Sequence, residues 1–464
     1  MRRFPNHSNL PAAIALAVAA WLSAPCARAD EPQVYALVNA RIVPVSSAPI
    51  EKGTVVIRKG IIEAVGTNLA VPADARVIDA AKLTVYPGLI DALSDVALEE
   101  PRAASAAAAA RPGVRTTAPP SAPTQESATS TPDERQGLTP YLRAADVLNP
   151  ANRKIEAARA AGITTALVAP RRGFFQGQSA LVNLSGTGGG RMVVKTPVAL
   201  HIGLQTAGGF GGGSYPGSLM GVLAFVKQTL LDSQHYEVAW STYSANRGAA
   251  RPEYSRALEA LEPVIKHELA VVLPGDTPAE IDRALRLAET FNLRMILSGG
   301  AEAARSAALL KEKRIPVLLS AKYPERDRDA DPEEQEELAV LRRRMEAPAT
   351  AAALQRAGVP FAFQSGDMTS PRDFIHNVAR SIEAGLERAA ALRALTLAPA
   401  EIFGVADRIG SIERGKAANL VVATGDIFDA RTRVKQVFID GRKFDIPEEE
   451  TPRPFEGRAS RGEQ

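Results

Sequence analysis

The histidines of this sequence are few and stand far apart. Beyond the first thirty residues no two of them have His-x-His or His-x-x-x-His spacing; the four are His201, His235, His267 and His376. Metal sites on one strand or one helix use those spacings because both imidazoles then lie on the same face. His235 and His267 stand in charged, helical surroundings and are expected to face solvent. His376 lies on a predicted helix, where a lid or packing role is expected.

One aspartate stands at the end of a predicted strand. Asp367 closes the apolar run VPFAFQSGD, which predicts a buried strand that ends beside it. The structural interpretation of this residue is that it caps its loop or the next helix.

Other side chains could join Asp367 in a metal site. His201 ends the apolar run VKTPVALHIGLQ, and Asp95 and Asp276 each follow an apolar segment. A site built from Asp95, Asp367 and His201, with Asp276, would suit Mg²⁺ or Ca²⁺ better than zinc because most of its ligands are carboxylates. The alternative for His201 is a hydrogen-bonded histidine of a loop or of the core.

A serine nucleophile has less support. Ser320 and Ser365 stand at predicted strand ends, but the sequence has no Gly-x-Ser-x-Gly elbow and no histidine that can be assigned as a partner.

The middle of the chain alternates short apolar strands with amphipathic helices. This alternation is typical of βα units around a parallel sheet, where strand ends meet at one mouth. The predicted strands are GITTALVAP, ELAVVLPG, LRMILSGG, IPVLLSA and VPFAFQSGD.

Both ends of the chain differ from the middle in amino-acid composition. Val34 to Val85 and the segments IGSIERGKAANLVVATGD and RVKQVFIDGRKF are rich in β-branched residues broken by Gly and Pro. Two such regions around a long middle predict one small β-sandwich assembled from both termini.

The first 29 residues have the form of a secretory leader. A basic start, the apolar run LPAAIALAVAAWLSA and the small-x-small sequence ARA before Asp30 predict cleavage after Ala29. The mature chain would then have no cysteine, which excludes disulfides and thiolate metal sites. We expect a periplasmic or secreted protein.

Charge argues against nucleic acid as a partner. The chain has 55 Lys and Arg against 52 Asp and Glu; the leader holds three arginines and no acid, so the mature balance is 52 against 52. A neutral chain lacks the electrostatic attraction that nucleic-acid binding uses. No later segment predicts a membrane span.

The framework motifs resemble those of the amidohydrolase superfamily, in its imidazolonepropionase-like branch. They are the opening hairpin ALVNARIVPV…GTVVIRKGIIEAVG, the turn VYPGLIDA, the strand AGITTALV and the return LTLAPAEIFGVADRIGSIERGKAANLVV. The resemblance implies an α/β fold, a (β/α)8 TIM barrel with a composite β-sandwich, and metal-assisted hydrolysis of carbon–nitrogen bonds in small amides or cyclic amides.

The resemblance also implies ligand positions that this sequence does not fill. After the turn aspartate, Asp91, the family has His-x-His where this chain has Leu93 and Asp95. Two further ligand histidines are expected where this chain has Pro274 and Gly299, within a residue of alignment. Asp367 stands near the family's metal-contacting, proton-moving aspartate.

Two other departures are informative. Lys195 precedes its strand instead of ending it, which argues against a carboxylated bridging lysine. The closing motif reads GKAANL, with Ala417 and Asn419 in place of two acids, a change expected to affect the sandwich rather than the mouth.

These observations predict a domain plan. It comprises a signal peptide 1–29, a composite β-sandwich domain 30–86 and 405–446, an amidohydrolase-like TIM barrel 87–404 with a flexible Ala/Pro/Ser/Thr-rich loop 101–140, and a polar C-terminal tail 447–464.

The replaced ligands predict a degenerate metal site with no metal cofactor, although the family would imply zinc or another divalent ion. We expect a weak or non-catalytic homologue that binds a small ligand or an active paralogue, or forms a homo-oligomer. The alternative is an active hydrolase whose metal site is built from Asp95, Asp367 and His201. Five aromatic residues of the stretch 218–267 are expected to pack in the core, with covering the mouth or forming a subunit contact as alternatives. They are Phe225, Tyr236, Trp240, Tyr243 and Tyr254.

Overall fold

The computed structural model describes residues 34–98, 133, 135–186, 188–206, 216–326 and 335–447. The proposed leader, nearly all of the loop 101–140 and the tail after residue 447 lie outside these residues. In the described part, none of the helices combines the length and apolar character that crossing a bilayer requires.

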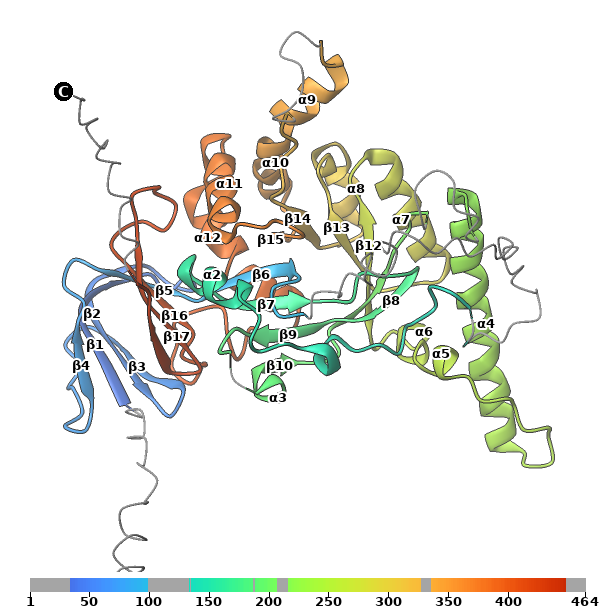
Figure 1. Ribbon diagram of the computed structural model, residues 1–464, viewed down its shortest axis with the longest axis horizontal. Coiled ribbons are helices and arrows are strands. Elements are labelled where there is room, and N and C mark those ends of the chain that lie inside the picture. The colour runs from blue at the N-terminus through green and yellow to red at the C-terminus, as the bar shows by residue number, and fades with distance from the viewer. Residues whose placement is uncertain are drawn as a thin grey trace, which may run out of the picture.

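One eight-stranded sheet is built from both ends of the chain and lies at one end of the molecule (Figure 1). Its strands are β1 Val34–Ile42, β2 Ile50–Arg58, β3 Ile61–Gly66, β4 Arg76–Asp79, β5 Thr84–Pro87, β16 Leu420–Ala423, β17 Val434–Ile439 and β18 Arg442–Asp445. The antiparallel pair β5–β16 joins the two contributions, with Leu420 opposite Pro87. Leu37, Ile57 and Phe438 are fully buried in the core of this sheet.

The hairpin β17–β18 shows why the last strands form where they do. Asp440 and Gly441 form its two-residue loop, both with positive φ, at 50° and 75°. Such a loop matches the natural twist of paired strands, and Asp-Gly is among its preferred sequences.

The middle of the chain forms two further sheets. The four-stranded sheet contains β6 Leu89–Ser94, β7 Ile163–Val168, β9 Ala180–Asn183 and β10 Val193–Lys195. The six-stranded sheet contains β8 Phe175–Gln178, β11 Ala199–Ile202, β12 Ala270–Gly275, β13 Met295–Gly299, β14 Val317–Ser320 and β15 Phe361–Gln364. Parallel pairing runs from β11 through β15 and between β6 and β7. All six residues of β7 are buried, as expected for a strand covered on both faces.

The two sheets meet at both of their ends. A parallel bridge joins Ser94, at the end of β6, to Gly366, just after β15. On the other side β8 and β9 are separated only by Ser179, and they run antiparallel to β11 and β7 respectively. This antiparallel segment departs from a regular βα alternation. The mixed α/β fold is confirmed; the closed (β/α)8 barrel and the sandwich remain predictions.

Helices surround these strands, with α7, α8, α10, α11 and α12 beside β12 to β15 (Figure 1). Their bounds are α2 Lys154–Ala160, α3 Gly189–Met192, α4 Leu219–Ala245, α5 Arg256–Glu259, α6 Glu262–Ile265, α7 Pro278–Thr290, α8 Ala307–Glu312, α9 Leu338–Glu346, α10 Thr350–Ala357, α11 Pro371–Glu383, α12 Arg388–Ala394 and α13 Leu397–Ile402. Three 3₁₀ turns are η3 Ala144–Val147, η4 Ala303–Ser306 and η5 Ala347–Ala349. Helix α7 begins where its sequence predicts, because Thr277 and Glu280 form a capping box and Pro278 follows the cap.

A buried polar network ties the terminal sheet to the middle strands. The Asn419 amide donates to Thr165 Oγ1 at 3.3 Å and to Asn183 Oδ1 at 2.9 Å, and its oxygen accepts from Asp440 N at 2.8 Å. Asn183 in turn donates to Asp440 Oδ1 at 2.8 Å. The departure from the family motif at Asn419 therefore lies at the join between the sheets, away from the strand ends.

We expect Asn419→Ala to lower the free energy of unfolding by about 2–3 kcal/mol, because it leaves buried partners of the amide unsatisfied. Urea denaturation measures this, with Asn246→Ala as the control, since Asn246 is exposed and accepts only a local bond from Gly248 N. Equal effects of the two substitutions would contradict the role assigned to the network.

Candidate functional site

A cavity of about 450 Å³ opens at the carboxyl ends of the strands, and we call it the mouth cavity. It is lined by residues that end or follow β6, β7, β11, β12, β13 and β15. Those that matter below are Leu93, Arg171, Phe174, Gln176, His201, Pro274, Ser298, Gln364, Gly366 and Asp367. This is the end of the strands at which the sequence predicts the site.

His201 lies in the wall of this cavity at the end of β11. It is 4% exposed, and its Nε2 has no hydrogen-bond partner in the described part of the chain. Burial, aided by the positive charge of Arg171, lowers the pKa of His201 to about 3. The imidazole is therefore neutral at physiological pH, and it offers a lone pair or an N–H to whatever enters the cavity.

Asp367 stands at the rim of the mouth cavity with a lysine as its partner. Lys322 Nζ lies 3.1 Å from both carboxylate oxygens. Partial burial raises the pKa of Asp367, but the hydrogen bonds and charge of Lys322 outweigh it, so the pKa lies below its ordinary value. The helix-capping interpretation of Asp367 is wrong, because Ser370 caps α11 by accepting from Asp373 N.

Asp95 does not reach the mouth cavity. It lines a separate, smaller cavity and forms an ion pair with Lys154, whose Nζ lies 3.0 Å from Oδ2. Asp276 is likewise absent from the lining of the mouth cavity; its Oδ1 accepts from Ala301 N at 3.2 Å. The structure brings His201 and Asp367 together and leaves Asp95 and Asp276 elsewhere.

At the positions expected to hold ligand histidines, side chains that are not histidine line the mouth cavity. Leu93, Pro274 and Ser298 face it; at the sixth-strand position Ser298, not the expected Gly299, does so. Gly299 has a φ of 103°, and a Cβ there would lie 2.6 Å from Asp276 Oδ1. That position therefore requires glycine. Among the described residues no group of three His, Cys, Asp or Glu side chains could hold a metal ion.

The turn aspartate, Asp91, is buried behind the mouth. Its Oδ1 accepts from Ser365 N at 2.9 Å and from Leu93 N at 3.3 Å, so it joins the end of β6 to the end of β15. Burial raises the pKa of Asp91 to about 6, against the opposing effect of these hydrogen bonds and those of the neighbouring serines. Gly366 N donates to Leu93 O at 2.9 Å and completes the junction.

The two serines offered as nucleophiles have structural partners. Ser365 Oγ lies 3.4 Å from Ser94 Oγ, and Ser320 Oγ accepts from Lys322 N at 3.2 Å. No hydrogen bond joins either serine to a histidine in the described residues, so the structure adds no support to a serine mechanism.

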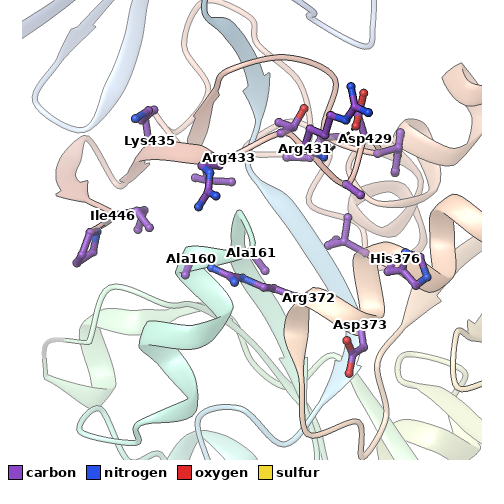
Figure 2. A pocket seen from close by; sticks show the side chains of 17 residues that line it. Ala160, Ala161, Arg372, Asp373, His376, Asp429, Arg431, Arg433, Lys435 and Ile446 are labelled. Carbon is purple, nitrogen blue, oxygen red and sulfur yellow. Dashed lines mark hydrogen bonds between the residues drawn. The ribbon is translucent and has the colours of Figure 1, made fainter. Parts of the chain in front are cut away.

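The remaining histidines and Lys195 lie away from the mouth cavity. His235 and His267 are exposed, as predicted. His376 is exposed on α11 and lines another cavity (Figure 2). Lys195 donates to the carbonyl of Phe403 at 2.7 Å, which fits the expectation that it is no bridging ligand.

The aromatic residues of α4 mostly pack. Phe225 is buried and stacks at 5.3 Å on Phe174, which lines the mouth cavity, so it supports that wall from behind. Trp240 contacts Tyr236 and Tyr243 at 6.1 and 6.0 Å between ring centroids. Tyr254 is exposed and donates to Glu259 Oε2 at 2.8 Å.

Sequence reasoning missed three cationic partners of the site. They are Lys154, Lys322 and Arg171, whose Nη2 donates to Gly366 O at 2.6 Å. Each pair joins residues far apart in the chain, and a lysine or arginine in a loop has no local pattern that marks it. Arg171 and Lys322 carried a positional signal, because they directly follow the predicted strands GITTALVAP and IPVLLSA.

Comparison with known proteins defines the class. Residues 280–444 match the amidohydrolase family. An amidohydrolase from Thermotoga maritima MSB8 has a TM-score of 0.70 and 26% identity, over 89% of this chain and 100% of that chain. Another amidohydrolase has a TM-score of 0.53 at 18% identity, over 90% of this chain and 100% of that chain. A prolidase complexed with N-methylphosphonate-L-proline has a TM-score of 0.53 at 16% identity, over 89% and 100%.

No curated protein matches the chain by sequence. The match over residues 280–444 and the Thermotoga structure confirm the resemblance to the amidohydrolase family that the framework motifs indicate. The more distant structures show the shared fold. Membership of the imidazolonepropionase-like branch remains a prediction.

The raised pKa of Asp91 predicts that folding stability depends on pH. Its folded pKa of about 6 lies above the ordinary 3.8, so the folded state holds the proton more tightly than the unfolded state. Folding stability therefore falls as pH rises from about 4 to about 6, and the loss amounts to about 3 kcal/mol above that window. Asp91→Asn keeps an oxygen for both backbone donors and carries no charge.

We expect Asp91→Asn to be more stable than the parent chain at about pH 7.5, with a difference that shrinks by about 2–3 kcal/mol at about pH 4. Denaturant unfolding at the two pH values measures it. A variant less stable at neutral pH, or a difference independent of pH, would show that the charged form is favoured at this site.

Proposed function

We propose that this protein is an exported, non-catalytic member of the amidohydrolase family that binds a small ligand in the mouth cavity. One observation carries the proposal: the two aspartates of the carboxylate site that the sequence suggested are each paired with a lysine. Asp367 has Lys322 and Asp95 has Lys154.

The lysine at Asp367 supports the loss of metal chemistry. A lysine ammonium supplies the positive charge that a metal would bring to this carboxylate, and the two would repel each other there. A zinc site needs three or four N, O or S donors within about 2.3 Å. The mouth offers His201 and Asp367, with leucine, proline and serine at the positions where the family resemblance implies imidazoles. These side chains do not fit the zinc that the family implies.

The protonation of these groups supports weak or absent hydrolysis. A metal ion lowers the pKa of bound water enough to make hydroxide near neutral pH, and no donor set for that ion is assembled among the described residues. The lowered pKa of Asp367 makes it a poorer proton acceptor for an unactivated water. Neutral His201 has no aspartate or serine partner that would activate it in the described part of the chain.

The mouth cavity suits a small ligand even without that chemistry. Its volume of about 450 Å³ falls in the usual range for small-molecule sites, and it combines an apolar floor with a few polar groups. Leu93, Phe174 and Pro274 supply apolar contacts, while Gln176, Ser298 and Gln364 supply hydrogen-bonding groups. A dipeptide-sized amide, the class that the prolidase relative suggests, is the ligand we propose.

The second candidate is an active hydrolase with a carboxylate-based metal site. In its favour, His201 and Asp367 line the same cavity. Against it, Asp95 lies in another cavity and both aspartates have lysine partners. Displacement of the Lys322 ammonium group from Asp367 by a metal ion would be the smallest change that restores such a site.

Metal content separates the two candidates. The exported chain, confirmed by intact mass to begin at Asp30, is purified without chelator, incubated with zinc and manganese, desalted and analysed by plasma mass spectrometry. We expect well below one metal per chain, unchanged in the Asp95→Asn, Asp367→Asn double variant. Near one metal per chain, lost in the double variant but kept in the exposed control Asp282→Asn, would establish the active-hydrolase alternative.

Ligand binding without turnover is the second expected outcome. Gly-Pro and Ala-Pro in excess should raise the melting temperature, and amine release should stay at the level of the buffer. Arg171→Gln, which alters the rim beside His201, should abolish the shift. Release of proline by the parent chain, lost in Asp367→Asn, would overturn the non-catalytic assignment.

A further inference from the structure

Helix α9 has no buried side chain, yet it carries three long apolar ones. Leu338, Leu341 and Met345 are 62%, 39% and 80% exposed. They recur at intervals of three and four residues, so they form one stripe along the helix, which we call the α9 stripe. Figure 1 shows α9 standing out from the other labelled helices, beyond α10. The α9 stripe is therefore an apolar helix face that the described part of the chain does not cover.

Ion pairs tie the opposite face of α9 to the body of the protein. Arg343 Nε lies 3.0 Å from Glu302 Oε1, and Arg305 Nη2 lies 2.9 Å from Glu346 Oε2. Both pairs join α9 to the turn η4 and the residue before it. At about 100° per residue, Arg343 lies on the side of the helix opposite to the α9 stripe. The helix is therefore held with its stripe directed away from the body.

These ion pairs do not account for the stability of the helix. A helix of nine residues is marginal by itself in water, because most helical stability in proteins comes from the packing of an apolar face. Ion pairs whose cations are exposed, as those of Arg305 and Arg343 are, contribute little. The α9 stripe is thus the part of the helix that a partner would stabilise by covering it.

The charges beside the stripe indicate the chemistry of that partner. Glu337 comes directly before Leu338, on one flank of the stripe, and Arg342 comes directly after Leu341, on the other flank. Neither of these two charged side chains has an ion pair in the described part of the chain. Their positions are the two flanking positions that form ion pairs between parallel paired helices. Glu337 of one copy would therefore meet Arg342 of a second copy, and the reverse.

A membrane surface is a poorer match for this helix. From Glu336 to Glu346 three glutamates stand against three arginines, so the formal charge of the segment is 3 − 3 = 0. Interfacial helices bind anionic lipid through an excess of Lys and Arg on their polar face. A surface with both signs of charge beside one apolar stripe is instead complementary to itself, as the two-fold interface of a dimer requires.

We propose that α9 pairs with α9 of a second copy of this chain, through the α9 stripe and two ion pairs between Glu337 and Arg342. The contact shares no residue with the lining of the mouth cavity and is independent of the proposed ligand. Because a helix of nine residues covers a small area, the dimer is a weak one, with a dissociation constant in the micromolar range.

Sedimentation velocity of the exported chain, from about 1 to about 200 µM, tests this pairing. We expect a monomer–dimer equilibrium, weakened at least about tenfold in Leu338→Gln because an apolar contact is lost from the interface. Val238→Gln is the matched control. Val238 lies on α4 and is 62% exposed, as Leu338 is, so its substitution should leave the equilibrium unchanged.

Charge reversal tests whether the partner is a second copy. Glu337→Arg and Arg342→Glu should each prevent self-association, because like charges then meet across the interface. In an equimolar mixture the two variants are complementary to each other, so the mixture should recover the dimer. Glu383→Arg, which reverses an exposed glutamate of α11, should leave the equilibrium unchanged.

Three results would overturn the proposal: a chain that stays monomeric over the whole range, a dimer weakened as much by Val238→Gln as by Leu338→Gln, or a mixture of the two reversed variants that stays monomeric. Equal weakening by the two glutamine variants would move the interface away from α9. Melting temperatures check that the variants fold, and if Leu338→Gln does not, Met345→Gln on the same stripe decides the question in its place.

Discussion

The buried carboxylate of Asp91 is the contact on which the mouth of this protein depends. It receives backbone N–H groups from Leu93 and from Ser365, and so holds together the ends of β6 and β15, the first and last strands of the middle sheets. Leu93, Gly366 and Asp367 take their positions from this junction. Burial costs the carboxylate its solvation, and its hydrogen bonds at the junction of the two strands offset part of that cost. The junction held by Asp91 fixes the geometry of the mouth whether or not the mouth cavity catalyses a reaction.

Under the non-catalytic proposal, the lysines beside Asp95 and Asp367 would supply one property of a metal ion and omit the others. An ammonium group neutralises a carboxylate and donates hydrogen bonds to it. It has no vacant orbital for a carbonyl oxygen, and it does not acidify water as a Lewis acid does. A site of this kind can therefore conserve shape and charge while catalysis is lost, which is why fold and chemistry are separable in one family.

The sequence predicted the framework more fully than the site. Strands such as β7 and β12 follow from apolar runs, and α7 follows from its capping box, because these signals are local. That Leu93 and Pro274 cannot bind a metal could also be read directly, because neither side chain carries a donor atom. The lysine partners could not be found, because Lys322 and Asp367 are 45 residues apart and meet only through the tertiary fold. For the same reason Asp95 was grouped with His201, although their strand ends open into different cavities.

The sheet assembled from both ends of the chain imposes an order on folding. Strand β5 has its partner in β16, and Tyr86 on β5 donates to the carbonyl of Gly425, 339 residues away. Until the last strands are available, β5 presents an unpaired edge, which is a template for wrong pairing between chains. Pairing over such a separation is also slow, because a long loop must close before the contact forms. The first strands to be synthesised are thus among the last to gain all of their partners.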